Sequence, residues 1–559
     1  MYDSQKLYSA LQELEVIPAN QLDKALSDAQ TQQTSLGNIL LDRSLLTEDD
    51  LGKLLSDIYN ISFIHISNII IPKDVLNMIP EEMARQQEII AFKQDEIGLH
   101  VALTDPTKTE TIEYIHNKLG LPIIVYQTTR SDIVSSLRLY LKDIAEAIED
   151  IINASIQEQQ SKKNQPIDPP IIKIVETIIT YGYENNASDV HLEPEESIAL
   201  VRFRIDGVLH DIIQLPLELY NQIVTRIKVI AKLRTDEHLV PQDGKIEFTV
   251  DKEQLDVRVS IVPIRRGEKV VMRLLAGNSR QITLTNLGFS IGDLGKVSNA
   301  YQKPYGMILS TGPTGSGKTT TMYAILTLLN NRDVNIMTIE DPIEYDIEGV
   351  NQIQVNLQTD LTFASGLRSI LRQDPNIILV GEIRDEETAD IAINAAMTGH
   401  LVLSTLHTND AATAIPRLLD MNIEPFLVSS TVNAIIGQRL VRKIHSACRV
   451  SDDVNMQTFT KFIDMALIQK IFGTQEKVLL YKGKGCELCH GTGYSGRIGI
   501  YEVMEINDDI KQAIVEKKDA TEIRKLAIQN GMMTMLEDGL NKVKAGETTI
   551  EELLRVTKE

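Results

Sequence analysis

Tryptophan is absent from this 559-residue chain, cysteine occurs only three times, and aromatic residues make up 5% of it. So few cysteines exclude a disulfide-stapled secreted domain, and a CxxC among them indicates a metal site instead. Basic residues are also in deficit, since 56 Lys and Arg face 78 Asp and Glu and the formal net charge is −22. Because binding to nucleic-acid phosphates needs a basic surface, we expect no nucleic-acid partner.

Long apolar runs are missing as well. No run approaches the ~18 residues that span a bilayer, and the opening MYDSQKLYSA lacks the basic and apolar regions of a signal peptide. We therefore expect a cytoplasmic protein. A composition that is 43% apolar and 24% charged is typical of a folded globular chain. At ~150 residues per domain, the length predicts roughly three or four domains.

A weak repeat runs through the first part of the chain. Its apolar positions recur at helical spacing, which predicts short amphipathic helices joined by turns. Further mixed strands and helices occupy 68–142, so we assign 1–150 to one helical and mixed amino-terminal domain. When the chain is shifted by 29 positions, Leu7, Leu11, Ile17, Leu22 and Leu26 fall on Leu36, Leu40, Leu46, Leu51 and Leu55.

Composition divides the remainder of the chain. The polar, proline-terminated stretch over 151–170 is typical of a linker. One helical pattern followed by alternating strands predicts an α+β domain over 171–276. After a short joint at 277–281, strands and helices alternate, which predicts an α/β domain over 282–559.

The α/β region opens with GPTGSGKTT, which follows an apolar strand at 307–310 and begins a helical run. Residues and context match the phosphate-binding loop G-x-x-x-x-G-K-[ST]. Glycines let backbone N–H groups approach the phosphates of ATP, Lys318 supplies a cation, and Thr319 offers a hydroxyl to Mg²⁺. The expected ATP-binding residues are Gly312, Pro313, Thr314, Gly315, Ser316, Gly317, Lys318, Thr319 and Thr320.

The following strands end in residues suited to hydrolysis. The strand at 334–339 ends in Glu340, and the strand at 377–380 ends in Gly381 and then Glu382. In an ordinary nucleotidase the second strand would end directly in an Asp that holds Mg²⁺ through water. His400 and His407 bracket a third strand at 401–405, near the edge where nucleotides bind in such sheets.

The motif series GPTGSGKTT, TIEDPIEY, IILVGEIRD and TGHLVLSTLHTND resembles the secretion ATPase superfamily, in its type II secretion and type IV pilus assembly branch. With ASDVHLEP, RFRIDG and GTGYSGRIGIYE, the resemblance covers about 170–559. It implies a multidomain α/β fold with a RecA-like ATPase core, a preceding α+β (PAS-like) domain and a small zinc-binding insertion. It also implies a homo-hexamer at the cytoplasmic face of the inner membrane, where a platform protein and a cytoplasmic assembly protein are its partners.

The resemblance also implies residue roles. Glu340 would orient or deprotonate the attacking water, Glu382 would replace the usual acid near Mg²⁺, and His407 would contact the γ-phosphate. Arginines supplied across the subunit joint would offset transition-state charge. The candidates of the second domain are Arg204, Arg258 and Arg273, and the alternative is that they only form an exposed charged sheet face.

All three cysteines lie late in the chain, as Cys448 and the pair Cys486 and Cys489, and His445 precedes the first by three positions. The family pattern has CxxC at both ends, whereas this chain has HxxC first. Zinc accepts Cys₃His sites, so we expect a zinc subdomain over 445–489. The alternatives are a degenerate site with free thiols, or His490 as a ligand.

The leucine repeat resembles the cyclic di-GMP-binding module of some pilus assembly ATPases. Those units begin with Arg-Leu-Gly, but here Lys6 and Ser35 stand at the arginine positions and Ser44 at a glycine position. An arginine is well suited to stack on guanine or to pair with its phosphate, and lysine does so less specifically. The sequence therefore favours docking to an inner-membrane assembly partner over cyclic di-GMP binding.

The pilus extension ATPase and the type II secretion ATPase share every motif of the core, so the core does not distinguish them. The long amino-terminal region favours pilus extension. It argues against a retraction motor, because the resemblance implies that the retraction branch of the family lacks such a region. A DNA-translocating ring is disfavoured by the net charge of −22. A nucleotide-locked scaffold without turnover is disfavoured by Glu340 and Glu382.

Overall fold

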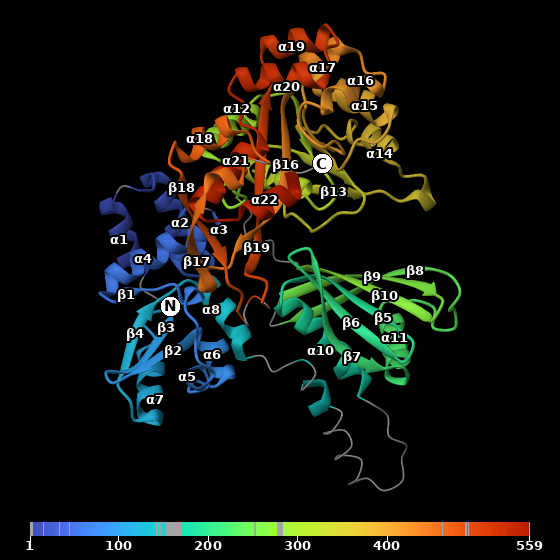
Figure 1. The fold of residues 1–559 in the computed structure, drawn as a ribbon. Helices are drawn as coiled ribbons and strands as arrows, with labels where there is room; N and C mark the ends of the chain where they lie inside the picture. Colours follow the sequence, from blue (N-terminus) through green and yellow to red (C-terminus); the bar gives the residue numbers. More distant parts are fainter. Residues whose placement is uncertain are drawn as a thin grey trace. The chain divides into compact units, whose positions relative to one another are not determined.

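The computed structural model describes residues 4–14, 16–32, 34–43, 45–140, 144, 147–151, 170–250, 253–276, 283–460, 462–486, 489 and 491–557. The chain forms two compact units, 1–281 with 446–448, and 282–445 with 449–559 (Figure 1). The expected linker over 151–170 lies outside the described residues except at its two ends, and the joint at 277–281 lies wholly outside them.

The leucine repeat folds into four helices, α1 (Ser4–Leu14), α2 (Ala19–Gln32), α3 (Leu36–Asp42) and α4 (Glu48–Tyr59). Thr47 begins α4 through a capping box with Asp50, which satisfies two otherwise unpaired groups at the helix start. The repeat positions supply the buried core of these helices, as their helical spacing predicts: Leu7, Leu11, Ile17, Leu22, Leu36, Leu40, Leu46, Leu51 and Leu55.

A small mixed sheet follows, with strand order β1-β4-β3-β2. The β1–β4 and β4–β3 pairs are parallel and the β3–β2 pair is antiparallel. Its strands are β1 (Ser62–Phe63), β2 (Ile89–Asp95), β3 (Gly98–Leu103) and β4 (Ile123–Gln127). Its helices are α5 (Lys73–Leu76), α6 (Glu81–Gln87), α7 (Thr109–Leu119) and α8 (Arg130–Leu137), with the 3₁₀ turns η1 (Ile66–Asn68) and η2 (Arg138–Tyr140).

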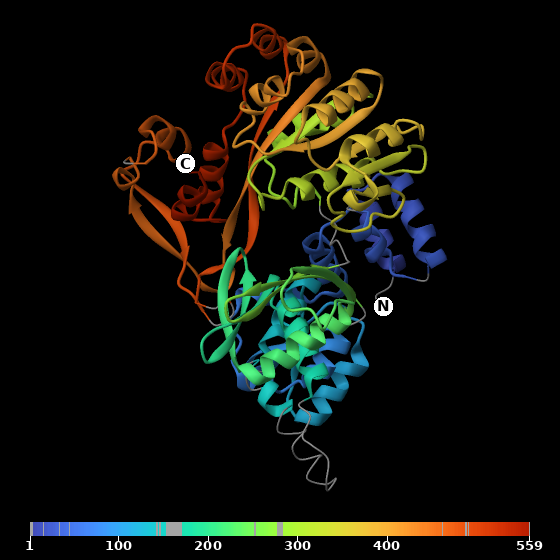
Figure 2. The same cartoon turned by 90° about the vertical axis from the view of Figure 1, so that its right-hand side faces the viewer.

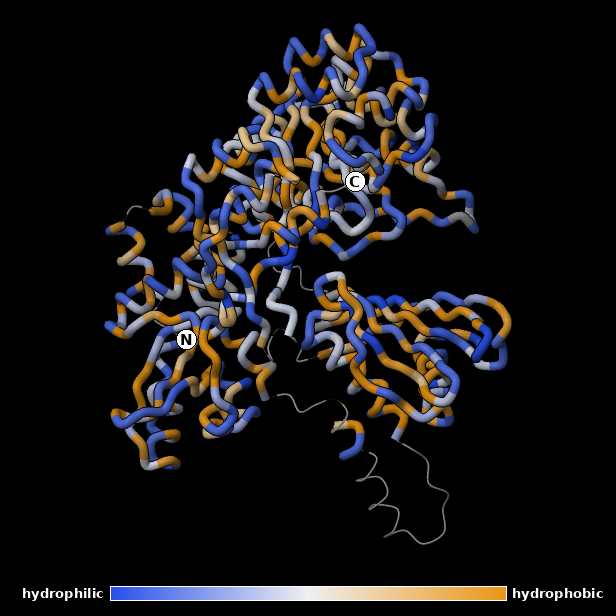
Figure 3. Tube along the Cα trace, in the orientation of Figure 1, coloured by the Kyte–Doolittle hydropathy of each residue, from blue (hydrophilic) through white to orange (hydrophobic). Residues whose placement is uncertain are grey.

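The second domain is a six-stranded antiparallel sheet of order β7-β6-β5-β10-β9-β8. Apolar and polar residues alternate along its strands (Figure 3), so one face is apolar and packs on α10 and α11 while the other face is charged. The elements are α10 (Ile171–Glu184), β5 (Ala187–Pro194), β6 (Ile198–Ile205), β7 (Val208–Pro216), α11 (Leu217–Ile230), β8 (Gln242–Val250), β9 (Glu253–Ile264) and β10 (Gly267–Ala276).

The second unit is built on a seven-stranded sheet of order β13-β12-β14-β15-β11-β16-β19, parallel except for β19. Its interior strands are almost uniformly apolar, as expected for a parallel sheet buried on both faces. The strands are β11 (Gly306–Thr311), β12 (Ile336–Glu340), β13 (Asn351–Gln354), β14 (Ile377–Val380), β15 (Leu401–Leu406), β16 (Val432–Ile444) and β19 (Tyr494–Glu505).

Helices cover both faces of this sheet. One face carries α12 (Ile291–Tyr301) and α13 (Lys318–Leu329). The other carries α14 (Phe363–Ile370), α15 (Glu386–Met397), α16 (Ala414–Asp420), α17 (Pro425–Thr431), α19 (Asp508–Val515) and α20 (Ala520–Gln529). In a third core, Val441 of β16 and Ile500 of β19 pack with α18 (Met465–Phe472), α21 (Met535–Ala545) and α22 (Ile550–Thr557).

A two-stranded ribbon of β17 (Arg449–Asn455) and β18 (Lys477–Gly483) interrupts the chain between β16 and β19. Figure 2 shows this ribbon (orange) extending away from the sheet. The 3₁₀ turns η3 (Leu357–Thr359) and η5 (Met456–Thr458) belong to this unit, and η4 (Ser446–Cys448) groups with the first. None of the helices in the described ranges combines the length and apolar character that crossing a bilayer requires.

Candidate functional site

The predicted phosphate-binding loop joins β11 to the first turn of α13, in the strand-loop-helix context that the motif requires. Gly312 lies close to two neighbours: a Cβ there would come within 2.4 Å of the Gln438 carbonyl oxygen and 2.6 Å of Ser316 Oγ. Pro313 and Thr314 are exposed at the loop tip, while Thr319 and Thr320 are half-buried at the start of α13.

Gln438 on β16 holds this loop to the sheet and was not found from the sequence. Its side-chain nitrogen donates to the Ser316 carbonyl oxygen at 2.8 Å, and its side-chain oxygen accepts from Ser310 Oγ at 3.0 Å. Gln438 is 1% exposed. In the described part of the chain, Ser316 Oγ is a buried atom with no hydrogen-bond partner, which leaves a hydroxyl for a ligand in this loop.

Lys318 folds back over the loop that it follows. Its ammonium donates to the carbonyl oxygens of Gly312 at 2.8 Å and Pro313 at 3.2 Å. Burial lowers the pKa of Lys318, and the negative charge of Glu382 opposes that shift. The charge of Glu382 thus acts on the lysine, although Lys318 begins α13 and Glu382 follows β14.

Glu382 and His407 meet at the carboxyl ends of β14 and β15. His407 Nε2 lies 2.9 Å from Glu382 Oε2, and Arg384 Nη2 lies 2.5 Å from Glu382 Oε1. Glu382 is largely buried, whereas His407 is half-exposed. Lys318, Glu382 and His407 thus form one polar group beside the phosphate-binding loop.

Gly381 explains why an acid does not end β14 directly. A Cβ at this position would lie 3.2 Å from the Glu340 Cα and 3.3 Å from the Ile339 carbonyl oxygen. These contacts are tighter than most real Cβ atoms make, so an aspartate would press on the neighbouring strand β12. The acid is therefore displaced by one residue, to Glu382.

Glu340 ends β12 but engages a different set of partners. Tyr323 donates its hydroxyl to Glu340 Oε2, and Oε1 accepts from Thr338 Oγ1 at 2.6 Å and from Gln352 Nε2 at 3.2 Å. Burial and the charge of Glu340 raise the pKa of Tyr323 and raise that of Tyr345 to about 12. Glu340 is therefore held in a buried network by α13 and β13.

His400 and His407 lie at opposite ends of β15. His400 precedes β15, and its Nδ1 lies 2.9 Å from the Ala395 carbonyl oxygen at the end of α15. His407 follows β15 at the edge where the phosphate-binding loop lies. The structure brings only the second of them to the candidate site.

The three candidate arginines lie together on the charged face of the six-stranded sheet. Arg204 on β6 and Arg273 on β10 both contact Asp189, which lies between them on β5. Arg258 on β9 is paired in register with Arg273. The sequence did not indicate Asp189.

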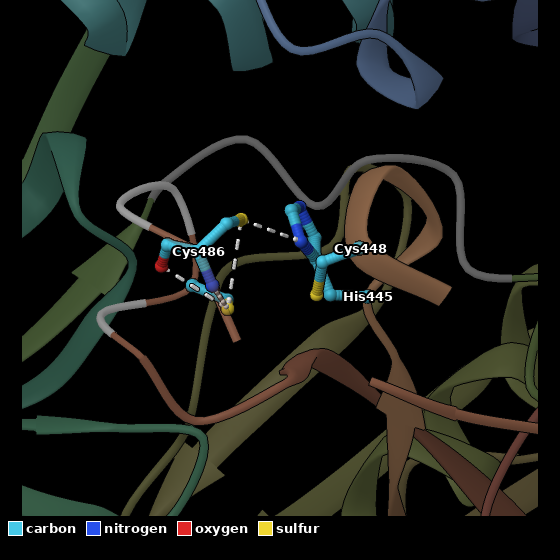
Figure 4. A group of neighbouring side chains, drawn as sticks. His445, Cys448 and Cys486 are labelled. Atoms are coloured by element: carbon cyan, nitrogen blue, oxygen red, sulfur yellow. Dashed lines mark hydrogen bonds between the residues drawn. The ribbon is translucent and has the colours of Figure 1, made fainter. Parts of the chain in front are cut away.

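His445, Cys448, Cys486 and Cys489 converge, with their ligand atoms within 4.8 Å of one another. Cys486 Sγ lies 3.3 Å from His445 Nδ1 and 3.7 Å from Cys489 Sγ (Figure 4). Burial lowers the pKa of His445, which favours the neutral imidazole that binds metals. His490, the alternative ligand, lies outside the described residues.

The residues that depart from the cyclic di-GMP module have structural roles. Ser35 begins α3 as its N-cap, accepting from the Asn38 backbone N–H. The Lys6 ammonium lies 5.5 Å from the centre of the Tyr59 ring. Ser44 lies outside the described residues. Both described side chains thus serve the packing and capping of the helices.

Comparison with known proteins places this geometry in a family. The model described as "Type II/IV secretion system protein" matches residues 164–555, and a model described as "MshEN domain" matches 59–147, which follows the leucine repeat. The type IV pilus assembly ATPase PilB of Myxococcus xanthus is 38% identical over 96% of both chains. The type II secretion system protein E of Dickeya dadantii is 41% identical over 86% of this chain and 97% of its own.

Among solved structures, the ATPase DotB of Legionella pneumophila matches with a TM-score of 0.52 and 20% identity, over 70% of this chain and 97% of its own. This likeness concerns the fold, and it confirms the predicted multidomain α/β architecture with a RecA-like core. The family model spans more than half of the chain, and the curated relatives span most of it. The chain therefore belongs to the type II/IV secretion system protein family and is an ATPase of that family.

Proposed function

We propose that this chain works as a homo-hexamer at the cytoplasmic face of the inner membrane and hydrolyses ATP to power type IV pilus assembly. The observation that carries the pilus role is the extent of the match to PilB, 96% of both chains including the amino-terminal domain. The type II secretion relatives align with less of this chain, from 70% to 86%. Type II protein secretion is the second candidate, because its proteins share the core at 41–46% identity.

The loop over 312–320 is suited to the phosphates of ATP. Gly312 permits the close approach of Gln438, and the unpartnered Ser316 hydroxyl faces the loop interior that Gly312 lines. Lys318 would exchange the carbonyl oxygens of Gly312 and Pro313 for the β- and γ-phosphates. Thr319 and Glu382 would hold Mg²⁺, which neutralises developing charge on the phosphates when it is bound.

The remaining polar residues suit hydrolysis. His407 and Arg384 both contact Glu382, and from the carboxyl end of β15 His407 would contact the γ-phosphate. Glu340 would orient or deprotonate the attacking water once its carboxylate leaves Thr338 and Gln352. Arg204, Arg258 and Arg273 would act on the nucleotide of the neighbouring subunit, which requires the ring.

The Cys and His cluster fits a structural zinc ion. Zn–S bonds of about 2.3 Å and Zn–N bonds of about 2.0 Å in a tetrahedron separate two sulfurs by roughly 3.8 Å and a sulfur from a nitrogen by roughly 3.5 Å. The S–S distance of 3.7 Å and the S–N distance of 3.3 Å are close to these values, and all four ligand atoms lie within 4.8 Å of one another. Cys486 and Cys489 directly precede β19, so zinc would clamp the base of the β17–β18 ribbon.

The partners that we propose are the inner-membrane platform protein and a cytoplasmic assembly protein. The amino-terminal domain is the candidate docking domain. Cyclic di-GMP binding is disfavoured there because Ser35 is committed to capping α3 and Lys6 lies over Tyr59. The net charge of −22 argues against a nucleic-acid partner.

Lys318→Ala and Glu382→Gln should separate binding from turnover. Removing the ammonium deletes contacts made in the ground and transition states alike, so ATP affinity should fall by about 10-fold or more. Glu382→Gln should bind ATP with near-native affinity and lose about 100-fold or more in kcat. Fluorescent nucleotide titration and phosphate release measure the two effects. Native turnover by Glu382→Gln would remove this residue from the reaction.

Gln438→Ala should weaken nucleotide binding although Gln438 lies on a neighbouring strand. It leaves the Ser310 hydroxyl and Ser316 carbonyl without their buried partner, and such losses correspond to about tenfold in affinity. Gln354→Ala, an exposed glutamine of β13, is the matched control and should bind ATP normally. Equal affinities of the two variants would show that the loop is held by other contacts.

The purified chain should contain close to one zinc ion by elemental analysis. Cys486→Ser should lose it, because the variant removes a negatively charged thiolate, and His445→Ala should retain part of it, because three thiolate ligands remain. Ser446→Ala, which lies between two of the ligands, should keep the metal. Chelation should increase proteolysis between 448 and 489 before the nucleotide core opens. Metal-free native protein would support the degenerate-site alternative.

A chromosomal deletion should distinguish the two candidate machines. Pilus assembly predicts loss of surface pili with secreted proteins unchanged, restored by the wild-type gene and not by the Lys318→Ala gene. Electron microscopy and analysis of the culture supernatant measure the two outputs. Normal pili together with loss of secreted proteins would assign the chain to type II secretion.

A further inference from the structure

A single cross-strand row runs over the charged face of the six-stranded sheet. Asp189 on β5 pairs in register with Arg204 on β6 and with Arg273 on β10. Arg273 pairs with Arg258 on β9, which in turn pairs with Lys245 on β8. Arg204 and Arg273 thus flank the Asp189 carboxylate directly, and Arg258 and Lys245 continue the row on the next two strands, where Lys245 is paired with Asp256.

Asp189 uses a different oxygen for each neighbour. Arg273 Nε donates to Oδ1 at 3.1 Å, and Arg204 Nε lies 3.5 Å from Oδ2, which also accepts from Ser188 Oγ at 2.8 Å. The Asp189 side chain is only 10% exposed, whereas that of Arg273 is 59% exposed. The carboxylate is therefore covered by the row, and a guanidinium that it holds stays accessible.

The atom through which Arg273 contacts Asp189 decides which of its N–H donors remain for another acceptor. Arg273 meets Asp189 through Nε, so the two terminal nitrogens point away from this contact and keep their donors for another acceptor. A hydrogen bond at Nε restricts the orientation of the planar guanidinium group. Bidentate binding of a phosphate requires such an orientation, because two N–H donors in that plane must reach two oxygens. Without Asp189, neighbouring cations across the sheet would repel one another and separate.

We propose that Asp189 is a positioning residue, which holds the guanidinium groups of Arg204 and Arg273 in the orientation that reaches the phosphates bound by the neighbouring subunit. This inference rests on the proposed function, in which these arginines act across the subunit joint. Asp189 itself does not contact ATP. Its removal leaves both positive charges present, with Arg273 deprived of its partner on β5 and Arg204 held, among the described residues, only through the bond from Nη1 to the Gly207 carbonyl oxygen at 3.1 Å.

Asp189→Asn tests this inference, and the same sheet offers a matched control. Arg202 Nε donates to Asp211 Oδ1 at 3.0 Å, and Asp211 is 67% exposed. Asp211→Asn therefore removes an equivalent contact from an arginine that lies outside the row. Asp189→Asn should lower kcat at least tenfold with KM for ATP within twofold of wild type, whereas Asp211→Asn should change neither. Both should melt at the wild-type temperature and form hexamers.

Mixed hexamers supply a readout that a structural role would not change. Asp189→Asn and Glu382→Gln chains carry defects on opposite sides of a joint, so their mixture should recover hydrolysis that neither shows alone. A mixture of Asp189→Asn and Arg204→Ala chains carries both defects on the same side and should stay inactive. In an Arg204→Ala/Arg273→Ala chain, Asp189→Asn should cost nothing further.

The outcomes separate this inference from the function on which it rests. Full activity of the Arg204→Ala/Arg273→Ala chain would remove the arginines from the reaction, and the inference with them. Impaired arginine variants beside a fully active Asp189→Asn chain would overturn the positioning role alone. An Asp189→Asn chain that melts early or fails to form hexamers would assign Asp189 to the sheet's stability and overturn the inference. Rescue of Arg204→Ala chains by Glu382→Gln chains without rescue of Asp189→Asn chains would also overturn the inference, whereas rescue of neither would overturn the action across the joint on which it rests.

Discussion

The hydrogen bonds of Gln438 hold the phosphate-binding loop to the central sheet. A loop that presents backbone N–H groups to a ligand cannot use them for its own structure, so it needs support from outside. Gln438 supplies this support from β16, the strand beside β11, through Ser310 on one side and Ser316 on the other. The geometry of Lys318 depends on the same support, because the lysine begins the helix that follows the loop.

A second constraint is the crowding where β12 and β14 end. A Cβ at Gly381 would lie only 3.2 Å from the Glu340 Cα, so a side chain there would press on β12. Glu340 lies in a network with Tyr323, while Glu382 contacts His407. The two acids that follow these strands therefore have separate sets of partners.

The sequence predicted the parts of the site that are encoded locally. The phosphate-binding loop has a fixed spacing, and parallel strands bring their carboxyl ends to one edge, so Glu382 and His407 could be placed together. Gln438 could not be found, because a lone glutamine in an apolar strand has no pattern and its partners are 122 and 128 residues away. Asp189 could not be found either, because its contacts depend on which strands lie beside β5. His400 and His407 both flank the same predicted strand, but only His407 follows it and lies at the edge of the phosphate-binding loop.

The convergence of His445, Cys448, Cys486 and Cys489 has a consequence for how this chain tolerates change. These residues lie where the chain leaves β16 and where it returns to β19, two neighbouring strands of the sheet that holds Gln438. A zinc ion held by these four residues would close the excursion at its base, so that the entropy of its interior would not depend on strand pairing and loop length would contribute only weakly to stability. Met456, Ile468 and Leu480 pack in the third core and fix most of the excursion, so changes in length fall on the exposed turn at 474–476. Residues added there would leave the register of β16 against β19 unchanged.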